Sequence, residues 1–409
     1  MGEAPSRTGE LLGIAAAHCL PVYRQRPMVL SHGRGSRLWD LDGRDYVDFA
    51  GGIAVCALGH ADPGLVQALA EQGGKLWHVS NVFHSEPPLR LADALVRASR
   101  FASRAFFCNS GAEANEAAIK LARRHAANRG RPAEKRVIVT AHGSFHGRTL
   151  ATVTATAQPK YQEGFEPLPG GFRHVDFNDL PALEAAMAGD DVCAVLLEPV
   201  QGEGGVMPAD AGYLRGVRAL CDAHGALLML DEIQCGMGRT GPLFAHWADE
   251  VVPDVVTLAK ALGAGFPIGA MLVGGDAADA LQFGSHGTTF GGNPLASAVA
   301  LAALERIDGE AIRENVRRQS RVLHEALVDI GRATGLFGEV RGRGLMLGAV
   351  LPPEHAARAG EILDAAAAHG VLLLQAGPQV LRFVPALNID DAEVADGLER
   401  LRTALRSLG

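Results

Sequence analysis

Lysine is scarce in this chain of 409 residues, which has only 5 lysines among its 38 basic residues. From Tyr161 to the last residue, Lys260 is the only one. Arginine carries a permanent charge, whereas a lysine amine can lose its proton and attack a carbonyl carbon. The choice of lysine at position 260 therefore suggests a chemical role for its nitrogen, with a surface lysine at a strand end as the alternative.

Other absences exclude several classes of protein. The six cysteines are scattered and form no C-x-x-C pair, which favours reduced thiols in a cytoplasmic protein. Acidic residues outnumber basic ones by 46 to 38, and no basic block occurs, which argues against a nucleic-acid partner. No apolar run reaches the roughly 18 residues of a membrane span. The apolar stretch Leu11–Leu20 lacks a basic flank, so we expect a short helix there and no signal peptide.

The length and the hydrophobic pattern predict two lobes. A chain of 409 residues exceeds the size at which one hydrophobic core stops growing. From residue 61 to residue 306, continuous apolar strands such as "VCAVLLEPV" and "ALLMLDEI" alternate with helical segments of 10 to 16 residues, among them Glu113–Asn128 and Asn293–Glu305. This alternation is typical of an α/β fold with a mostly parallel central sheet covered by helices.

The two ends of the chain are predicted to form the smaller lobe. A long helix at Ile312–Ile330 is followed by "EVRGRGLMLGAVL", another helix, the strands "GVLLLQA" and "VLRFVPAL", and a final helix. These segments indicate an α+β lobe at 307–409. The segment "SRLWDLDGRDYVDFA" reads as a strand and hairpin that pack with it. We therefore expect an N-terminal segment at 1–60, a large domain at 61–306 and a small domain at 307–409.

Polar residues at the ends of the predicted strands are the first candidates for a site, because ligands of such sheets gather there. In "CNSGAEANEAAIK", Ser110 and Glu113 form an S-x-x-E capping box, and Gly111 and Ala112 leave the first turn open to a phosphate. The alternative is that the segment only starts a helix.

Asp231, at the end of "ALLMLD", is a carboxylate that needs a partner if it is buried. The protonated ring nitrogen of a cofactor or a helix N-terminus would each provide one. Gln234 follows one turn later. Lys260 lies among apolar residues in "TLAKAL", where burial would lower the pKa of its amine.

Two arginines and one glutamate complete the set of candidates. Arg148 in "FHGRT" and Arg382 in "VLRFVPAL" are suited to bidentate capture of carboxylates. Glu203, in the glycine-rich "QGEGGV", is placed to neutralise one of them when no substrate is bound. His142 and His146 lack the glutamate of a zinc motif, so no metal is expected.

Together these segments resemble the class-III, pyridoxal-phosphate-dependent aminotransferases and, within them, the acetylornithine aminotransferases. The resemblance runs from "LPVY" to "VLRFVPALNI" and rests on separated motifs in the same order. These motifs are "NSGAEANEAAIK", "FHGRT", "LEPVQGEGGV", "LDEIQCGMGRTG", "LAKALGAGFPIGAM" and "HGTTFGGNP". It implies the fold of type I pyridoxal-phosphate transferases, pyridoxal 5'-phosphate as cofactor, and a homodimer with its active site at the subunit interface.

The resemblance also implies a role for each candidate residue. Lys260 would hold the cofactor covalently, and Asp231 would keep its ring nitrogen protonated. Gln234 would contact the phenolic oxygen and Phe145 the ring face. Gly111 and Ala112 would bind the phosphate, together with Thr289 of the other subunit. Substrate binding would fall to Arg148 with Thr288 nearby, to Arg382 gated by Glu203, and to Tyr23.

The implied reaction is reversible transfer of the terminal amine of N2-acetylornithine to 2-oxoglutarate, as in arginine biosynthesis. Ile53 stands where ornithine aminotransferases have a tyrosine that helps hold a free α-amino group, which favours an acylated donor. Several alternatives stay open: a succinylornithine aminotransferase, an enzyme that also takes succinyldiaminopimelate, an aminomutase, and a binding protein that has kept only the fold.

Overall fold

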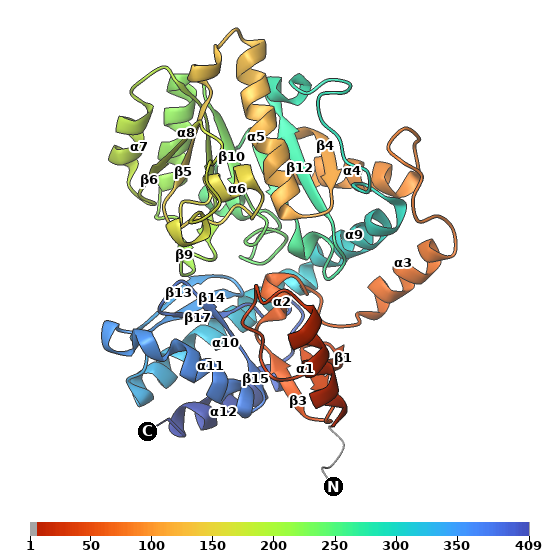
Figure 1. Ribbon diagram of the computed structural model, residues 1–409, viewed down its shortest axis with the longest axis vertical. Helices are drawn as coiled ribbons and strands as arrows, with labels where there is room; N and C mark the ends of the chain where they lie inside the picture. Colours follow the sequence, from red (N-terminus) through yellow and green to blue (C-terminus); the bar gives the residue numbers. More distant parts are fainter. Residues whose placement is uncertain (1–5, 409) are drawn as a thin grey trace.

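The computed structural model describes residues 6–408, so the first five residues of the predicted N-terminal segment and the last residue of the predicted small domain lie outside it. Seven strands form the sheet of the upper lobe in Figure 1, in the order β4-β12-β11-β10-β7-β5-β6. Their bounds are Ala102–Cys108, Gly269–Gly274, Val255–Leu258, Leu227–Asp231, Val192–Leu197, Val137–Ala141 and Phe172–Val175.

The predicted α/β sheet is confirmed, with one difference. Strands β11, β10, β7, β5 and β6 pair in parallel, and β12 runs antiparallel to both of its neighbours, β11 and β4. The apolar run of β12 carries no sign of its direction, because a strand buried on both faces reads the same in either sense.

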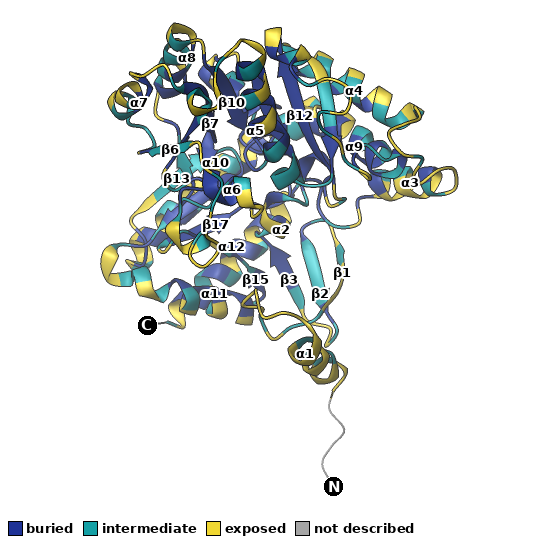
Figure 2. Cartoon of the chain, turned by 45° about the horizontal axis from the view of Figure 1, so that its top comes forward, coloured by how far each residue is buried: buried dark blue, intermediate teal, exposed yellow. Residues whose placement is uncertain are grey.

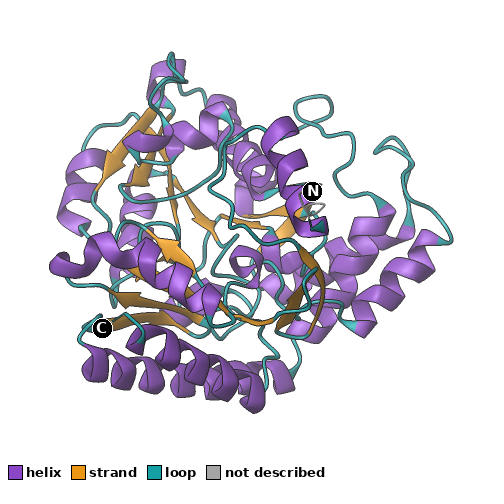
Figure 3. Ribbon diagram, turned by 60° about the horizontal axis from the view of Figure 1, so that its bottom comes forward, coloured by secondary structure: helices purple, strands orange, loops and turns teal. Residues whose placement is uncertain are grey.

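Alternate residues of the strands face two separate hydrophobic cores. Leu196, Met229 and Val255 pack with α5 (Gly111–Asn128) on one face. Leu197, Leu230 and Val256 belong to the larger core on the other face, with α8 (Tyr213–His224) and α9 (Pro294–Ile307). Figure 2 shows these strands as continuously buried, and Figure 3 shows helices outside them. Coverage of both faces explains why the strands are apolar throughout.

The lower lobe in Figure 1 combines the two ends of the chain. One sheet has the order β13-β14-β17-β16, and a second has the order β1-β2-β3-β15. In the second sheet, β3 (Asp45–Asp48) of the N-terminal segment pairs in parallel with β15 (Val371–Leu372) of the C-terminal segment. The remaining strands are Leu30–Arg34 (β1), Arg37–Asp40 (β2), Glu339–Arg343 (β13), Met346–Val350 (β14), Leu374–Ala376 (β16) and Val380–Phe383 (β17).

Three helices cover the lower lobe, with bounds Glu310–Thr334 (α10), Ala359–Ala368 (α11) and Asp391–Arg406 (α12). The expected short helix near the N-terminus is also present, as α1 (Arg7–His18). Between residues 6 and 408, no helix has the length and apolarity needed to cross a membrane. The helices α3 (Pro63–Gly73) and α4 (Glu86–Ser99) lead from the lower lobe into the upper one.

Candidate active site

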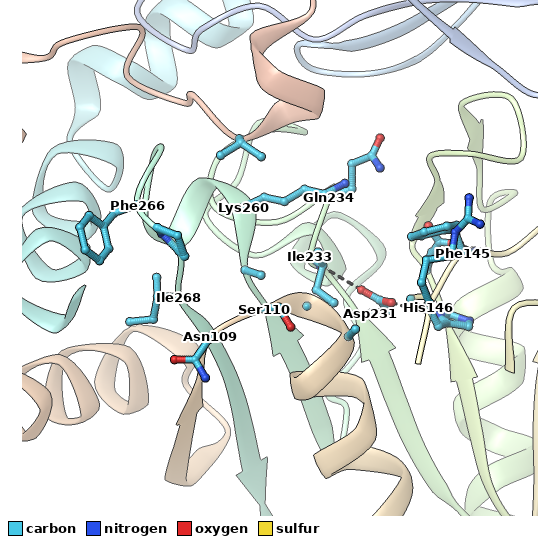
Figure 4. Close-up of a pocket in the computed structure, with 18 of the residues that line it drawn as sticks. Asn109, Ser110, Phe145, His146, Asp231, Ile233, Gln234, Lys260, Phe266 and Ile268 are labelled. Atoms are coloured by element: carbon cyan, nitrogen blue, oxygen red, sulfur yellow. Dashed lines mark hydrogen bonds and ion pairs between the residues drawn. The ribbon is translucent and has the colours of Figure 1, made fainter. Parts of the chain in front are cut away.

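A cavity of about 400 Å³ opens at the carboxyl ends of β7, β10 and β11. Asp231 is the last residue of β10, and Lys260 follows β11 by two residues. Seven of the predicted site residues line this cavity: Gly111, Ala112, Phe145, Arg148, Asp231, Gln234 and Lys260. Figure 4 shows how side chains from separate loops converge on it. Its size is that of a site for a small ligand.

Lys260 has the properties expected of a reactive amine. Its backbone is left-handed, with φ of 44°, which is unusual for a residue with a side chain. Its Nζ forms no ion pair and donates no hydrogen bond to any of residues 6–408, and Lys260 lines the cavity. Burial lowers the pKa of Lys260 to about 8, against the opposing effect of the Glu203 carboxylate. The neutral, nucleophilic form is therefore far more accessible than in an ordinary lysine.

Asp231 is held in place from two sides. Its Oδ2 accepts hydrogen bonds from Asn115 Nδ2 at 2.7 Å and from His146 Nδ1 at 2.8 Å. Its Oδ1 accepts only the Ile233 N–H among the described residues, at 3.1 Å. Figure 4 draws the Ile233 and His146 contacts. The buried carboxylate is thus oriented toward the cavity with acceptor capacity to spare, as a cationic ring nitrogen requires.

The start of α5 forms one end of the cavity. Ser110 is the N-cap, and its side chain accepts the N–H of Glu113 at 3.2 Å. The predicted capping box is wrong in its second half, because the Glu113 carboxylate accepts the N–H of Asn109 at 2.8 Å instead of that of Ser110. A Cβ at Gly111 would approach the Ile233 side chain to 2.8 Å, so any larger residue would force that side chain to shift. This open helix start suits a phosphate group.

Arg148 stands at the rim of the cavity between two aromatic rings. Its guanidinium carbon lies 3.8 Å from the ring centre of Tyr161 and 5.5 Å from that of Phe145. The side chain is exposed and pairs with no carboxylate among residues 6–408. Stacking holds the guanidinium in one orientation while its N–H groups stay available for a carboxylate.

Arg382 and Glu203 form the predicted ion pair. Arg382, only 2% exposed, donates from Nη1 to Oε1 of Glu203 and, at 2.9 Å, to Oε1 of Gln234. Burial by itself would raise the pKa of Glu203, but the Arg382 charge outweighs it and the pKa is lowered. Gln234 lines the cavity, so this pair is joined to it by one side chain.

Besides Glu203 and Arg382, four further residues named from the sequence do not line this cavity in the single chain. Tyr23 is 79% exposed, and Thr289 lines a second cavity with Asn81 and Phe83. Thr288 accepts a hydrogen bond from Asn109 Nδ2 at 3.3 Å, beside the cavity wall. Ile53 is 43% exposed with φ of 66°, and Val55 lines the cavity in its place.

Sequence reasoning missed four residues of the site. His146 and Asn115 position Asp231, Glu198 lines the cavity, and Tyr161 stacks on Arg148. The sequence predicts no role for His146 beyond its exclusion as a zinc ligand. The described residues contain no cluster of three or more acidic, histidine or cysteine side chains arranged for a metal. The signal for Asn115 was its position one turn into α5, facing the strand ends.

The sequence profile of the class-III aminotransferases matches residues 21–405. The chain belongs to the class-III aminotransferases. An acetylornithine aminotransferase of Xanthomonas campestris pv. campestris is 69% identical over 95% of this chain and 96% of its own length. A succinylornithine transaminase/acetylornithine aminotransferase of Pseudomonas aeruginosa is 54% identical over 96% of both chains.

Solved structures agree with this assignment. The crystal structure of N-acetylornithine aminotransferase from Stenotrophomonas maltophilia is 58% identical, covers 97% of this chain and 99% of its own, and has a TM-score of 0.86. Class-III aminotransferases use pyridoxal phosphate, so the predicted cofactor and the type I transferase fold are confirmed. The amine of Lys260, the oriented carboxylate of Asp231 and the open start of α5 fit its aldehyde, ring nitrogen and phosphate.

Proposed function

We propose that this transaminase exchanges the terminal amine of N2-acetylornithine with the oxo group of 2-oxoglutarate. The products are N-acetylglutamate 5-semialdehyde and glutamate, and the reaction is reversible. The names of the relatives at 69% and 58% identity support this choice of substrates. The observation that carries it is the pair of separate arginines, one free at the cavity rim and one masked by a glutamate.

The two arginines answer a problem of geometry. N-acetylornithine carries its reacting amine far from its carboxylate, whereas glutamate carries its amine beside one of its two carboxylates. One fixed clamp cannot align both amines with the same reacting carbon. We assign the α-carboxylate of the donor to Arg148, with Thr288 and Tyr23 as further contacts. Arg382 receives glutamate or 2-oxoglutarate once Glu203 has moved away.

The remaining side chains hold and prepare the cofactor, which acts as an electron sink for the donor carbon when bound. Asp231 would accept a hydrogen bond from its ring nitrogen, Gln234 would contact its phenolic oxygen, and Phe145 would lie on its ring face. Gly111 and Ala112 would donate N–H groups to its phosphate. Lys260 Nζ would hold the cofactor covalently, and as a free amine it would take up the proton of the donor carbon.

We also propose a homodimer, in which Thr289 of one subunit reaches the phosphate bound by the other. Large apolar side chains on two adjacent loops support it: Trp77, Val82, Phe83, Phe283 and Phe290 are all exposed in the single chain. Exposed apolar clusters of this kind are typical of protein interfaces. We further propose a cytoplasmic location, which the free thiols at all six cysteines support. The proposed domain bounds are 1–60 for the N-terminal segment, 61–306 for the large domain and 307–409 for the small domain.

A succinylornithine or dual activity is the second candidate, because the relative from Pseudomonas aeruginosa carries both names. The purified protein should be assayed with 2-oxoglutarate and N-acetylornithine, N-succinylornithine, N-succinyldiaminopimelate or ornithine. We expect kcat/KM to be highest for N-acetylornithine and the reaction to stop without 2-oxoglutarate. A strong preference for the succinyl donors, or turnover without an acceptor, would overturn the proposed substrate.

A further inference from the structure

Glu198 is a buried carboxylate beside Asp231 to which the proposed mechanism gives no role. It directly follows β7, and Leu197 of β7 pairs with Leu230 of β10, so Glu198 and Asp231 end neighbouring strands. Glu198 is 4% exposed and lines the same cavity. Burying a second carboxylate there costs free energy unless its oxygens accept hydrogen bonds.

The contacts of Glu198 join two loops that are far apart in the sequence. Its Oε2 accepts the N–H of Phe145 at 3.0 Å, and its Oε1 accepts the N–H of Gly202 at 3.2 Å. Phe145 faces the cavity, and Gly202 immediately precedes Glu203, the residue that masks Arg382. One carboxylate therefore fixes the backbone of the residue on the cofactor face and of the loop that carries the gate.

The Gly202 loop has little freedom to settle elsewhere. A Cβ at Gly202 would lie 2.4 Å from the side-chain amide of Gln234, so the loop backbone packs directly against that side chain. Gln234 in turn accepts a hydrogen bond from Arg382. A shift of the Gly202 N–H would thus be passed both to Glu203 and, through Gln234, to Arg382.

The pKa of Glu198 lies in the physiological pH range. Burial raises its pKa to about 7, His146 opposes this, and Asp231 adds to it. Glu198 also interacts electrostatically with Lys260 and Cys235. The ionised form accepts both N–H groups, whereas protonation turns one oxygen into a donor and weakens the link.

We propose that Glu198 is a positioning residue that couples the seating of the cofactor against Phe145 to the setting of the Glu203–Arg382 gate. The part of this inference that concerns substrate choice rests on the proposed function. The part that concerns cofactor affinity does not, because that affinity is measured without any amino donor.

Glu198→Gln tests this coupling, because glutamine keeps the shape but offers one acceptor oxygen for two N–H groups. Loss of one such bond predicts about a 10-fold weaker Kd for pyridoxal phosphate, measured by spectrophotometric titration of the apoenzyme. The ratio of kcat/KM for N-acetylornithine to that for glutamate should change by a similar factor. The wild type should lose cofactor affinity as the pH falls through about 7 more steeply than the variant.

Asp62→Asn is the matched control. Asp62 is also buried and accepts two backbone N–H groups, those of Gly64 and Leu65, but it caps α3 outside the cavity. It should lower the thermal midpoint without changing the Kd or the donor ratio. If Glu198→Gln does not fold, Glu198→Asp, which keeps the charge but is too short to reach both N–H groups, replaces it.

An unchanged cofactor Kd and donor ratio in the Glu198 variant would overturn the inference. The inference would also fail if Asp62→Asn changed the cofactor Kd and the donor ratio as much as Glu198→Gln does, at the same loss of thermal stability. A wild-type enzyme that fails to use N-acetylornithine would instead refute the proposed substrate, while the cofactor titration would still decide the role of Glu198.

Discussion

Lys260 and Asp231 illustrate how much of the chemistry depends on single side chains in an apolar setting. Both come directly from the ends of hydrophobic strands, and the sequence alone singled them out because a charge is unexpected there. The residues that position Asp231 leave no such signal in the sequence. His146 and Asn115 contact Asp231 only because the fold brings together residues more than 80 positions apart. A local sequence pattern cannot predict a contact between residues so far apart.

Arg148→Lys should impair one half of the reaction more than the other. A lysine offers a point charge and cannot reproduce the bidentate, stacked guanidinium. We expect kcat/KM for N-acetylornithine to fall by about 10- to 100-fold and that for glutamate to change far less. Stopped-flow measurement of each half-reaction separates them. Arg100→Lys, which removes a guanidinium stacked on Trp247 outside the cavity, is the control. Equal losses in both half-reactions would rule out the division of labour.

Glu203→Ala should leave Arg382 permanently available. Donors with an α-carboxylate next to the reacting amine should then gain relative to N-acetylornithine, by about 10-fold for the loss of a charge-assisted hydrogen bond. Competition between glutamate and N-acetylornithine in one assay measures this ratio. Glu361→Ala, which breaks the exposed ion pair with Arg358, serves as control. A donor profile identical to that of the wild type would contradict the gate.

At the scale of elements, the sequence predicted which segments are helices and strands but missed several of their relations. The ends of α5 and α9 came within two residues of the prediction, because capping residues and apolar periodicity are local signals. The pairing of β3 with β15 joins residues more than 300 positions apart, and the sequence predicted only that the two ends pack together. The left-handed turn at Gly51–Ala54 includes Ile53 and Ala54, for which propensity predicts the opposite.

His60 links the end of β3 to the chain that leads into the large lobe. Its Nε2 lies 2.7 Å from Oδ2 of Asp48, and this hydrogen bond raises the pKa of His60 to about 10 from 6.5. The stabilisation is therefore complete below pH 6.5 and is lost as the pH rises through about 10. His60→Gln should destabilise the protein by about 2 kcal/mol at pH 6.

Thermal unfolding of the wild type and His60→Gln at pH 6, 8 and 10 measures this effect. We expect the gap between their midpoints to shrink steadily with rising pH. Arg37→Gln, which breaks ion pairs of β2 in the same sheet without a group that titrates in this range, is the control and should give a constant gap. A His60 gap that is constant or grows toward pH 10 would refute the link.

At the scale of the whole molecule, Val55 of the N-terminal segment lines the cavity together with residues of the large lobe, and the proposed homodimer would add Thr289 of a second subunit. Thr289 lies in the second cavity, away from Lys260, and the loops around it expose large apolar side chains. The sequence resemblance predicted a shared site, whereas composition and periodicity carried no information on assembly. An interface appears in a sequence only as apolar residues, which look the same as residues of the core.

Co-expression of two inactive variants tests the shared site. Lys260→Ala lacks the nucleophile, and Thr289→Asp places a negative charge against a phosphate of the partner. Random pairing yields about half mixed dimers, each with one intact site, so about a quarter of wild-type activity should return. Each variant expressed alone is the control and should be inactive. Absence of any recovered activity in dimers shown to be mixed would exclude a shared site.

The covalent attachment of the cofactor to Lys260 is the claim on which the rest depends. The holoenzyme should be reduced with borohydride, digested and examined by mass spectrometry. We predict that the pyridoxyl-phosphate group is found on the peptide with Lys260 and on no other lysine, and that Lys260→Ala carries none. Modification of Lys75, Lys120, Lys135 or Lys160 in its place, or an unmodified Lys260 in a protein that retains the cofactor, would contradict the account.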